Sequence, residues 1–400
     1  MTEDNIVAFI DIGSAETKVF IAEIFPQINI VGVSSGKTDG MSKGEIVNLA
    51  ALKESVHTVI RDAEEIAGAA TQIRRACLAI SSMDVGGMQV SGLTSVKSDD
   101  AAVSREDMHA ARVDAYCRKC PAGRTIVHRL KQSFVLDSAV MENPEGRRGE
   151  KLAYDMWLVD AETKYLTELI QIPNNYGMRV EELFLASLAS AAAVSTGSEN
   201  DKNRLVIDIG AGTTDYILYQ NGIVRKTGVV PVGGAHITND ISSAMRTSTD
   251  RAEWLKKEAG RAFLKDEDIN SEIAIMPTES DLAEFTEKVS RYKLNYVISM
   301  RVFETFELVK KALGEDANIS GVHLTGGTSK LKGIAYVAAE VFNCEVVSAE
   351  PNCAFARTFS DPKFSTVVGM ADLLRRRRNE AAQSRANNTL RARIAALFTH

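Results

Sequence analysis

The stretch IVAFIDIGSAETKVFIAE, from Ile6 to Glu23, recurs in altered form as RLVIDIGAGTTDYILYQN, from Arg204 to Asn221. Aligning Asp11 with Asp208 also matches Ile12 with Ile209, Gly13 with Gly210 and Thr17 with Thr214. Each copy is an apolar run, then Asp-Ile-Gly, a small polar turn and a second β-branched run, which predicts a β-hairpin with a glycine-rich tip. Two matched hairpins in one chain indicate two related domains facing each other across a cleft, whereas two unrelated surface hairpins are the simpler alternative.

The residues at the two tips are suited to binding a phosphate chain. Glycine allows a close backbone approach, and successive exposed N–H groups bind anions. The phosphate ligands expected from the tips are Gly13, Ser14, Thr17, Gly210, Gly212, Thr213 and Thr214. Asp11 and Asp208 repel phosphate but can hold a hydrated Mg²⁺ that the phosphates also bind, and Lys18 can neutralise phosphate charge. We therefore expect both tips to close on one Mg²⁺–triphosphate.

Two further patterns fit the sugar and base of a nucleotide. The segment from Val322 to Gly333, VHLTGGTSKLKG, predicts a strand, a turn at Gly326-Gly327 that passes flat against a planar or ribose group, and the start of a helix. Glu253, Lys256 and Gly260 are spaced i, i+3 and i+7, which predicts one helix face that presents a carboxylate and an ammonium to sugar hydroxyls. An ordinary solvated helix with a salt bridge explains the second pattern as well.

The order of the two hairpins, the Glu-x-x-Lys helix and the Gly-Gly turn resembles the superfamily of actin, sugar kinases and heat-shock chaperone ATPases. Within it, the chain resembles the FtsA family of bacterial actin-like cell-division proteins over essentially all 400 residues. The supporting stretches are GMSKGEIVN (40–48), the segment 127–137, NPEG (143–146), FSTVVG (364–369) and a basic amphipathic tail. The resemblance implies an α/β, actin-like two-lobed ATPase fold with an FtsA-type inserted subdomain and a C-terminal amphipathic helix.

The resemblance also implies a division of the chain. Residues 1–82 and 161–203 form the first lobe, and residues 83–160 form the inserted subdomain, used for filament contacts and partner binding. Residues 204–250 and 317–349 form the second lobe, with the second hairpin and the adenosine turn, and residues 251–316 are its partner-binding insertion. Residues 350–374 return to the first lobe, and residues 375–400 form a basic linker and a membrane-targeting helix. In the superfamily, the segment 229–240, with Gly233 and Gly234, connects the lobes near the γ-phosphate.

Composition indicates an ordinary globular protein of at least two domains, with 45% apolar and 25% charged residues. The sequence has no apolar run long enough to cross a membrane and no signal-peptide core at its start, and its five dispersed cysteines indicate a reducing compartment. Cys117 and Cys120 lie between His109 and His128, which leaves a zinc site open, although no second tight ligand pair accompanies them. A helix-to-loop connection before Pro121 is the other explanation, and the resemblance implies no metal there.

Positive charge is concentrated in the tail. The chain has a net charge of −6, but residues 375–400 hold seven arginines against one carboxylate, so the tail carries +6. The apolar side chains of Leu390, Ile394, Leu397 and Phe398 fall on one helical stripe flanked by Arg391 and Arg393. This pattern is typical of an interfacial membrane helix and not of a nucleic-acid arm. One copy would bind weakly and a filament firmly; a disordered tail that folds back on the body is the alternative.

The resemblance implies a peptide partner as well. FtsA binds the C-terminal peptide of the tubulin-like FtsZ through the second-lobe insertion, and Arg301 and Glu304 stand in the matching R-x-x-E helix. Arginine can hold a peptide carboxylate with two hydrogen bonds, although an intrahelical salt bridge explains the same spacing. The chain departs from the family at Ala211, where many relatives have glycine, which is tolerated if φ is negative, and at its LFTH ending, which lacks the usual tryptophan and lysines.

Together these features predict a protein that binds ATP and Mg²⁺, polymerises at the inner face of the cytoplasmic membrane and tethers the FtsZ ring during bacterial cell division. Its expected partners are FtsZ, other division proteins, further copies of the chain and the anionic membrane surface, but not nucleic acid. The motifs contain no evident general base, so we expect slow ATP hydrolysis at most, with Asp208 or a polar residue near the first hairpin orienting the attacking water. The alternatives are a PilM-like scaffold of type IV pilus machinery, without the lipid and FtsZ contacts, and a small-molecule kinase.

Overall fold

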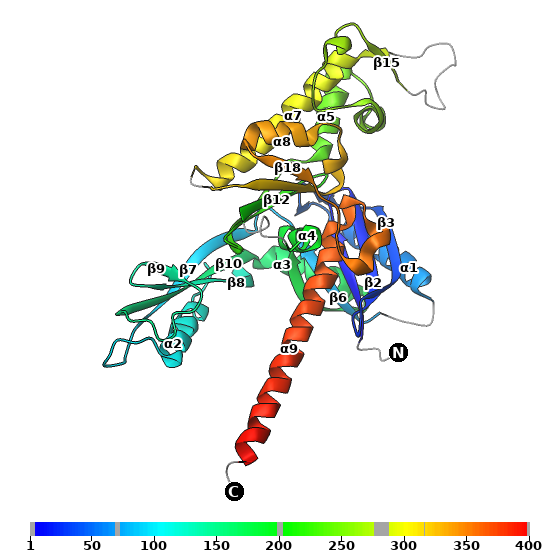
Figure 1. The fold of residues 1–400 in the computed structure, drawn as a ribbon. Helices are drawn as coiled ribbons and strands as arrows, with labels where there is room; N and C mark the ends of the chain where they lie inside the picture. The colour runs from blue at the N-terminus through cyan, green and yellow to red at the C-terminus, as the bar shows by residue number, and fades with distance from the viewer. Residues whose placement is uncertain (1–4, 69–72, 198–202, 276–287, 316, 398–400) are drawn as a thin grey trace.

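The computed structural model describes residues 5–68, 73–197, 203–275, 288–315 and 317–397, with side chains as far as residue 382. The first repeated hairpin lies at the centre of a five-stranded sheet with the order β11-β6-β1-β2-β3 (Figure 1). Its strands are β1 (Ile6–Ile12), β2 (Glu16–Glu23), β3 (Asn29–Lys37), β6 (Arg75–Ile80) and β11 (Arg179–Leu185). The β1, β2 and β3 strands pair antiparallel, whereas β6 and β11 continue the sheet in parallel.

The second lobe repeats this sheet strand for strand, in the order β18-β17-β12-β13-β14. Its strands are β12 (Arg204–Ile209), β13 (Thr214–Gln220), β14 (Ile223–Val230), β17 (Gly321–Thr325) and β18 (Glu345–Ser348). As in the first lobe, the three strands of the hairpin side, β12, β13 and β14, pair antiparallel, and β17 and β18 continue the sheet in parallel. The prediction of two related domains is therefore confirmed.

Helices cover both faces of the first sheet because alternate side chains of its central strands point to opposite faces. On one face, Ala8 and Ile10 of β1 pack with α1 (Leu49–Ala67) and α3 (Thr163–Tyr176). On the other face, Val7 and Phe9 pack with α4 (Ala186–Val194) and the first turns of α9 (Ser365–Leu397).

The second lobe has its own apolar core, formed by the sheet and the helices α5 (Gly234–Met245), α7 (Arg291–Leu313) and α8 (Ile334–Phe342). The shorter elements nearby are α6 (Thr249–Trp254), a π-helical turn at Leu255–Ala259, and the pair β15 (Glu272–Ala274) and β16 (Lys288–Ser290). The segment 229–240 runs from β14 directly into α5, both of which belong to this lobe. The resemblance implied that this segment connects the lobes, but it lies within the second lobe.

A separate four-stranded sheet is inserted into the first lobe between β6 and α3. It has the order β7-β10-β8-β9, with β7 (Gly86–Ser95), β8 (Arg124–Leu136), β9 (Ala139–Met141) and β10 (Lys151–Glu162), and α2 (Arg105–Tyr116) covers one face. This subdomain also contacts strand β14 of the second lobe, because Trp157 Nε1 donates to Thr227 Oγ1 at 3.0 Å. A short pair, β4 (Met41–Ser42) and β5 (Glu45–Ile46), precedes α1.

Helix α9 is continuous from Ser365 to Leu397, so the linker predicted after residue 374 is absent from this part of the described chain. Figure 1 shows α9 leaving the first lobe as one long rod. At its base, four consecutive arginines are paired with carboxylates, Arg375 and Arg376 with Asp372, Arg377 with Glu182, and Arg378 with Glu181. The predicted tail charge of +6 includes these four arginines, but their carboxylate partners offset their charge.

The predicted membrane stripe lies beyond the described side chains. Helix α9 includes Leu390, Arg391, Arg393, Ile394 and Leu397 by backbone alone, and Phe398 lies outside the described residues. No helix in the described ranges is long and apolar enough to cross a membrane.

The atoms that a zinc ion would need from His128 and Cys120 have other partners. His128 is buried on β8, where its Nε2 accepts the Leu185 N–H at 2.9 Å, and burial together with the Arg377 charge lowers its pKa to about 3. The Cys120 thiol donates to the Arg124 carbonyl oxygen at 3.0 Å. Among the described residues, no group of three or more His, Cys, Asp or Glu side chains is arranged to hold a metal ion.

Candidate functional site

A cavity of about 840 Å³ lies between the two lobes, and both repeated hairpins line it. The structure brings most of the predicted nucleotide-site residues to its wall: Asp11, Gly13, Ser14, Lys18, Asp208, Gly210, Thr213, Gly234, Glu253, Lys256, Gly326 and Gly327. These residues come from sequence positions up to about three hundred residues apart, and only the pairing of the two lobes brings them together.

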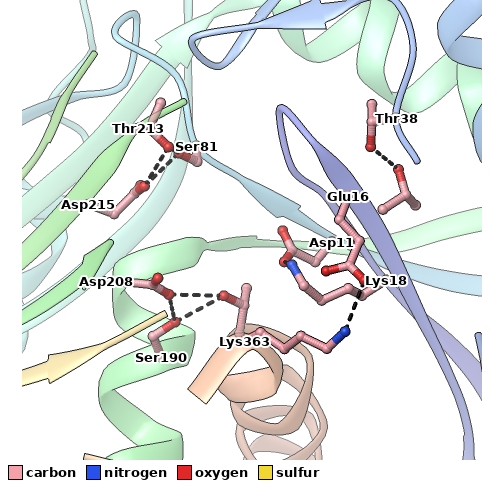
Figure 2. A network of polar contacts seen from close by, with 12 residues as sticks. Asp11, Glu16, Lys18, Thr38, Ser81, Ser190, Asp208, Thr213, Asp215 and Lys363 are labelled. Carbon is pink, nitrogen blue, oxygen red and sulfur yellow. Dashed lines mark hydrogen bonds and ion pairs between the residues drawn. The ribbon is translucent and has the colours of Figure 1, made fainter. Parts of the chain in front are cut away.

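In the first hairpin, Asp11 and Lys18 are cross-strand partners, and their side chains form an ion pair at 3.0 Å. Burial alone would lower the pKa of Lys18, but the neighbouring Asp11 charge and hydrogen bond raise it overall, so the ammonium stays charged. At the tip, Ser14 Oγ accepts the Gly44 N–H at 3.0 Å. The Glu16 carboxylate, which the sequence argument did not single out, pairs with Lys363 at 2.9 Å at the cavity wall (Figure 2).

In the second hairpin, two hydroxyls hold the Asp208 carboxylate. Its Oδ2 accepts from Ser190 at 2.5 Å and from Thr366 at 3.2 Å, and those two hydroxyls lie 3.0 Å apart. Figure 2 shows Asp208 above Ser190, on the opposite side of the drawn network from the first hairpin. Burial and the Asp11 charge raise the pKa of Asp208, and the Ser190 hydrogen bond offsets part of that increase.

A second carboxylate in this hairpin, Asp215, lies at the boundary between the lobes. Its Oδ2 accepts from Ser81 of the first lobe at 2.7 Å and from Thr213 at 3.1 Å. Burial and the Asp208 charge raise its pKa to about 8. Asp215 was not predicted as a site residue, although aligning the two hairpins places it on Lys18, so a change from ammonium to carboxylate is visible in the sequence at this position.

Two of the predicted phosphate ligands do not face the cavity. Thr17 is buried and shares a 2.8 Å hydrogen bond with Thr38, and Thr214 is buried with its hydroxyl donating to the Val232 carbonyl oxygen at 2.7 Å. Successive residues of a strand point to opposite faces, so the strand that directs Lys18 or Asp215 to the cavity directs the preceding threonine away from it. The structure corrects this part of the phosphate-site prediction.

Gly212 and Gly233 support the site by packing. A Cβ on Gly212 would meet Ser14 Oγ at 2.2 Å, and one on Gly233 would meet the Gly210 carbonyl oxygen at 2.7 Å. Glycine is therefore needed where the second tip approaches the first tip and the start of α5. The departure at Ala211 is accommodated as expected, because Ala211 is not among the residues with positive φ.

Glu253 and Lys256 lie at the cavity, but Gly260 does not share their helix face. Helix α6 ends at Trp254, a π-helical turn follows, and Gly260 is extended at its end. The spacing rule assumed regular α-helical turns and failed here. Lys256 Nζ donates to Glu253 at 2.6 Å, to Thr238 Oγ1 at 2.8 Å and to the Gly234 carbonyl oxygen at 3.0 Å, so this lysine holds the wall of the cavity together.

The Gly326-Gly327 turn follows β17 as predicted, with Gly326 at φ 86°. A Cβ on Gly326 would meet Asp208 Oδ1 at 2.2 Å, so only glycine allows the turn to approach this carboxylate. The predicted helix start is a short 3₁₀ segment, Gly327–Lys330, and the α-helix begins later at Ile334.

The arrangement suits a hydrated divalent cation and a phosphate chain. Asp11 and Asp208 face one cavity from opposite lobes, and Lys18 is close enough to both for their charges to raise its pKa against the effect of burial. Two carboxylates that leave room for water are the ligand set that Mg²⁺ accepts. The backbone of both tips, with Ser14 and Thr213, is available to phosphate oxygens.

The predicted partner residues lie on α7, away from the cavity. Arg301 holds Asp240 of α5 with two hydrogen bonds, at 2.5 and 3.2 Å, and pairs with Glu304 at 2.6 Å. The intrahelical salt bridge that the spacing allowed is therefore present. The same helix exposes Leu308 and a stripe of four further large apolar side chains at spacings of four, four and three residues, namely Tyr292, Tyr296, Met300 and Phe303.

Two lobes of identical topology that close on a cleft lined by paired Asp-Ile-Gly hairpins define an actin-like fold, and solved structures agree. The PilM protein of a type IV pilus biogenesis complex, PilM–PilN, is similar with a TM-score of 0.61 at 16% identity, over 91% of this chain and 97% of that chain. MreB5 of Spiroplasma citri bound to ADP is similar with a TM-score of 0.56 at 13% identity, over 94% of this chain and 99% of that chain. Likenesses at this identity show the fold alone.

Sequence comparison identifies the family. The model for cell division protein FtsA matches residues 205–369, and the model for the SHS2 domain inserted in FtsA matches residues 84–159. Cell division protein FtsA of Borreliella burgdorferi is 30% identical over 376 residues, and that of Neisseria meningitidis serogroup B is 29% identical over 378, each covering 92% of this chain and 90% of the relative. The chain belongs to the FtsA family.

Proposed function

We propose that this chain is an actin-like, ATP-binding cell-division protein that polymerises at the inner face of the cytoplasmic membrane and tethers the FtsZ ring. The observation that carries the proposal is the cleft between two matched Asp-Ile-Gly hairpins in a member of the FtsA family. The relatives that match 92% of the chain are named as cell division proteins, which supports the role in division over that of a pilus scaffold.

In this proposal the cleft holds Mg²⁺ and ATP. Asp11 and Asp208 would hold the cation through water, and Gly13, Ser14, Gly210 and Thr213 would contact the phosphates. Lys18 would offset the negative charge that the carboxylates and phosphates bring together. Gly326-Gly327 would lie against the ribose and base, with Glu253 available to the sugar hydroxyls. The cation would supply charge neutralisation along the phosphate chain.

We expect the nucleotide to act mainly as a ligand that closes the cleft and promotes assembly. Turnover requires a group that orients the attacking water, and Asp208 is the residue proposed for it. Two hydroxyls already donate to its Oδ2, so this oxygen can accept a proton from the attacking water only by giving up one of these hydrogen bonds. ATP hydrolysis is therefore expected to be slow.

The exposed apolar stripe on α7 is the proposed binding surface for the C-terminal peptide of FtsZ. Aromatic and methionine side chains are enriched at protein interfaces, and Met300 and Phe303 are exposed on this helix. Arg301 and Glu304 border the stripe, although Arg301 is also bound to Asp240. The inserted subdomain, residues 83–160, is proposed to contribute to contacts between copies in the filament and to other division proteins.

The C-terminal part of α9 is proposed to bind the anionic membrane surface. The support for this step is the sequence pattern of Leu390, Ile394, Leu397 and Phe398 with Arg391 and Arg393, on a helix that projects from the first lobe (Figure 1). A peripheral position on the inner face of the cell membrane at the division site follows from this attachment and from the FtsZ contact. Each copy would bind weakly, and the filament would supply avidity.

Calorimetric titration of ATP tests the nucleotide step, with Mg²⁺ and with excess EDTA. We expect Mg²⁺ to tighten ATP binding by at least about tenfold, because two carboxylates hold the cation. Asp11→Asn should remove that gain, and Asp266→Asn, an exposed aspartate in the second lobe, should keep it. Equal ATP affinity with and without Mg²⁺ in the unmodified chain would overturn the proposed use of the cleft.

A further inference from the structure

The first turn of α9 contacts the cleft directly. Thr366 is 5% exposed, and its hydroxyl donates to Asp208 Oδ2 at 3.2 Å and lies 3.0 Å from Ser190 Oγ. The neighbouring residue, Ser365, is fully buried and shares a 2.6 Å hydrogen bond with Thr325, at the end of β17. The first two residues of α9 therefore bind the ends of two second-lobe strands, although the helix packs in the first lobe.

The next turns of α9 have little freedom to move relative to α4. A Cβ on Gly369 would lie 1.7 Å from the Ala189 carbonyl oxygen, so the two helix backbones are nearly in contact. Val367, Met370, Ala371 and Leu374 fill the core of the first lobe beside this crossing. One turn further on, the carboxylates of Glu181 and Glu182 on β11 hold Arg378 and Arg377.

The same carboxylate thus connects the cleft with the base of the C-terminal helix. Asp208 comes from β12 of the second lobe, Ser190 from α4 of the first lobe and Thr366 from α9. The Ser190 hydroxyl is also fully buried, so the three groups form a closed network rather than a solvated surface contact. A ligand that moves or reorients Asp208 must change its contact with Thr366.

We propose that Thr366 is a positioning residue, which orients Asp208 toward the cation of the bound nucleotide and makes α9 respond to occupancy of the cleft. This inference rests on the proposed function, because it assumes that Mg·ATP binds at Asp208. The α4 crossing and the ion pairs of Arg377 and Arg378 fix the later turns of α9 in the first lobe. The change is therefore expected in the first turn, where Ser365 and Thr366 bind second-lobe strands. The backbone amides of this first turn would then exchange at different rates in the empty and the loaded protein.

The test uses the full chain with substitutions at Thr366 and two readouts that need no turnover. The first readout is ATP affinity with Mg²⁺ and with EDTA, and the second is hydrogen–deuterium exchange of α9 with and without Mg·ATP. Thr366→Val keeps the shape and removes the donor, and Thr366→Ser keeps the donor. Thr167→Val is the matched control, because Thr167 is an exposed threonine on α3 whose hydroxyl bonds only within its helix, to the Thr163 carbonyl oxygen.

In Thr366→Val we expect Mg·ATP affinity to fall by roughly tenfold, the loss typical of a hydrogen bond to a charged group, with affinity in EDTA unchanged. We also expect Mg·ATP to alter exchange in α9 of the unmodified chain, Thr366→Ser and Thr167→Val, but not of Thr366→Val. If Thr366→Val matches Thr167→Val in both readouts while the unmodified chain binds Mg·ATP, this inference alone is overturned. If the unmodified chain binds no Mg·ATP, the proposed use of the cleft falls first and the inference falls with it.

Discussion

Asp208 and Asp215 are directly opposite each other in the β12–β13 hairpin, whereas the equivalent pair in the first hairpin is Asp11 and Lys18. The first hairpin therefore compensates its carboxylate with an ammonium, and the second places two carboxylates side by side in a buried setting. Burial and then the Asp208 charge raise the pKa of Asp215 to about 8. The second hairpin is thus electrostatically strained when the cleft holds no cation. This strain should make the stability of the protein depend on pH.

The raised pKa of Asp215 should make the protein less stable as pH rises. Its pKa is about 8 in the folded state and near 3.8 in the unfolded state, so between these values the folded state binds the extra proton. Each pH unit in that window lowers the free energy of unfolding by up to about 1.4 kcal/mol. Asp215→Asn cannot ionise, so in EDTA its thermal midpoint should change less from pH 5 to pH 8 than that of the unmodified chain. If the thermal midpoints of the two proteins changed equally from pH 5 to pH 8, Asp215 would be ionised in the folded state and this prediction would be wrong.

The crossing of α4 and α9 should tolerate no side chain at Gly369. An added Cβ would lie 1.7 Å from the Ala189 carbonyl oxygen, so the backbones must separate. We expect Gly369→Ala to lower the free energy of unfolding by about 3 kcal/mol or more in urea denaturation. Gly321→Ala is the matched control, because its Cβ would meet its nearest neighbour at 3.7 Å, and we expect a change within about 0.5 kcal/mol. Equal effects at the two sites would refute the close approach of these helices.

The α7 stripe should carry much of the affinity for the C-terminal peptide of FtsZ. Phe303 is 44% exposed, so truncating it removes contact area without opening the core. We expect Phe303→Ala to weaken peptide binding by roughly tenfold in fluorescence anisotropy, the size of a typical aromatic interface contribution. Tyr336→Ala on α8 removes another exposed aromatic side chain, 60% exposed, and should leave binding unchanged. Equal binding by both variants would place the peptide elsewhere on the chain.

The arginines of the tail should differ in their contribution to membrane binding. Arg376 is paired with Asp372 at the base of α9, whereas Arg391 and Arg393 lie in the distal part of the helix. A basic residue at an anionic surface contributes about 1 kcal/mol, so replacing Arg391 and Arg393 with glutamine should weaken vesicle binding by roughly tenfold or more. Arg376→Gln should have a smaller effect in the same flotation assay. A loss at Arg376 as large as the double substitution would mean that charge at the base of α9, and not its distal stripe, attracts the membrane.

The elements that could be predicted from the sequence are those whose signal is local and repeated. The Asp-Ile-Gly hairpins and the Gly326-Gly327 turn follow from alternation and glycine, and the repeat of the hairpins predicted the two lobes. The cavity-facing side chains were harder to predict. Successive side chains of a strand point to opposite faces, so either Thr17 and Thr214 or their neighbours face the ligand. The prediction for the tips left this alternation out.

Other features depend on packing between distant segments, which no local pattern records. The π-helical turn that removes Gly260 from the face of Glu253 is one example. The hydrogen bonds of Ser190 and Thr366 to Asp208 are another, because they join residues up to 158 positions apart. The ion pairs of Arg377 and Arg378 are a third, since their carboxylate partners on β11 lie almost two hundred residues earlier in the chain. Each of these features is visible only in the folded structure.

Co-sedimentation with vesicles that contain anionic phospholipid, in the presence of Mg·ATP, tests the proposed role most directly. The comparison is between the full chain and a chain truncated after Asn379, which retains every ion pair of Arg375 to Arg378 at the base of α9. We expect the full chain to pellet with the vesicles and to show filaments on them by electron microscopy, and the truncated chain to remain in the supernatant. If both chains stay in the supernatant, the C-terminal helix is not a membrane anchor, and a soluble scaffold like that of the pilus machinery becomes the better description. If both pellet equally, a part of the chain before residue 380 binds the membrane, and the proposed anchor is wrong.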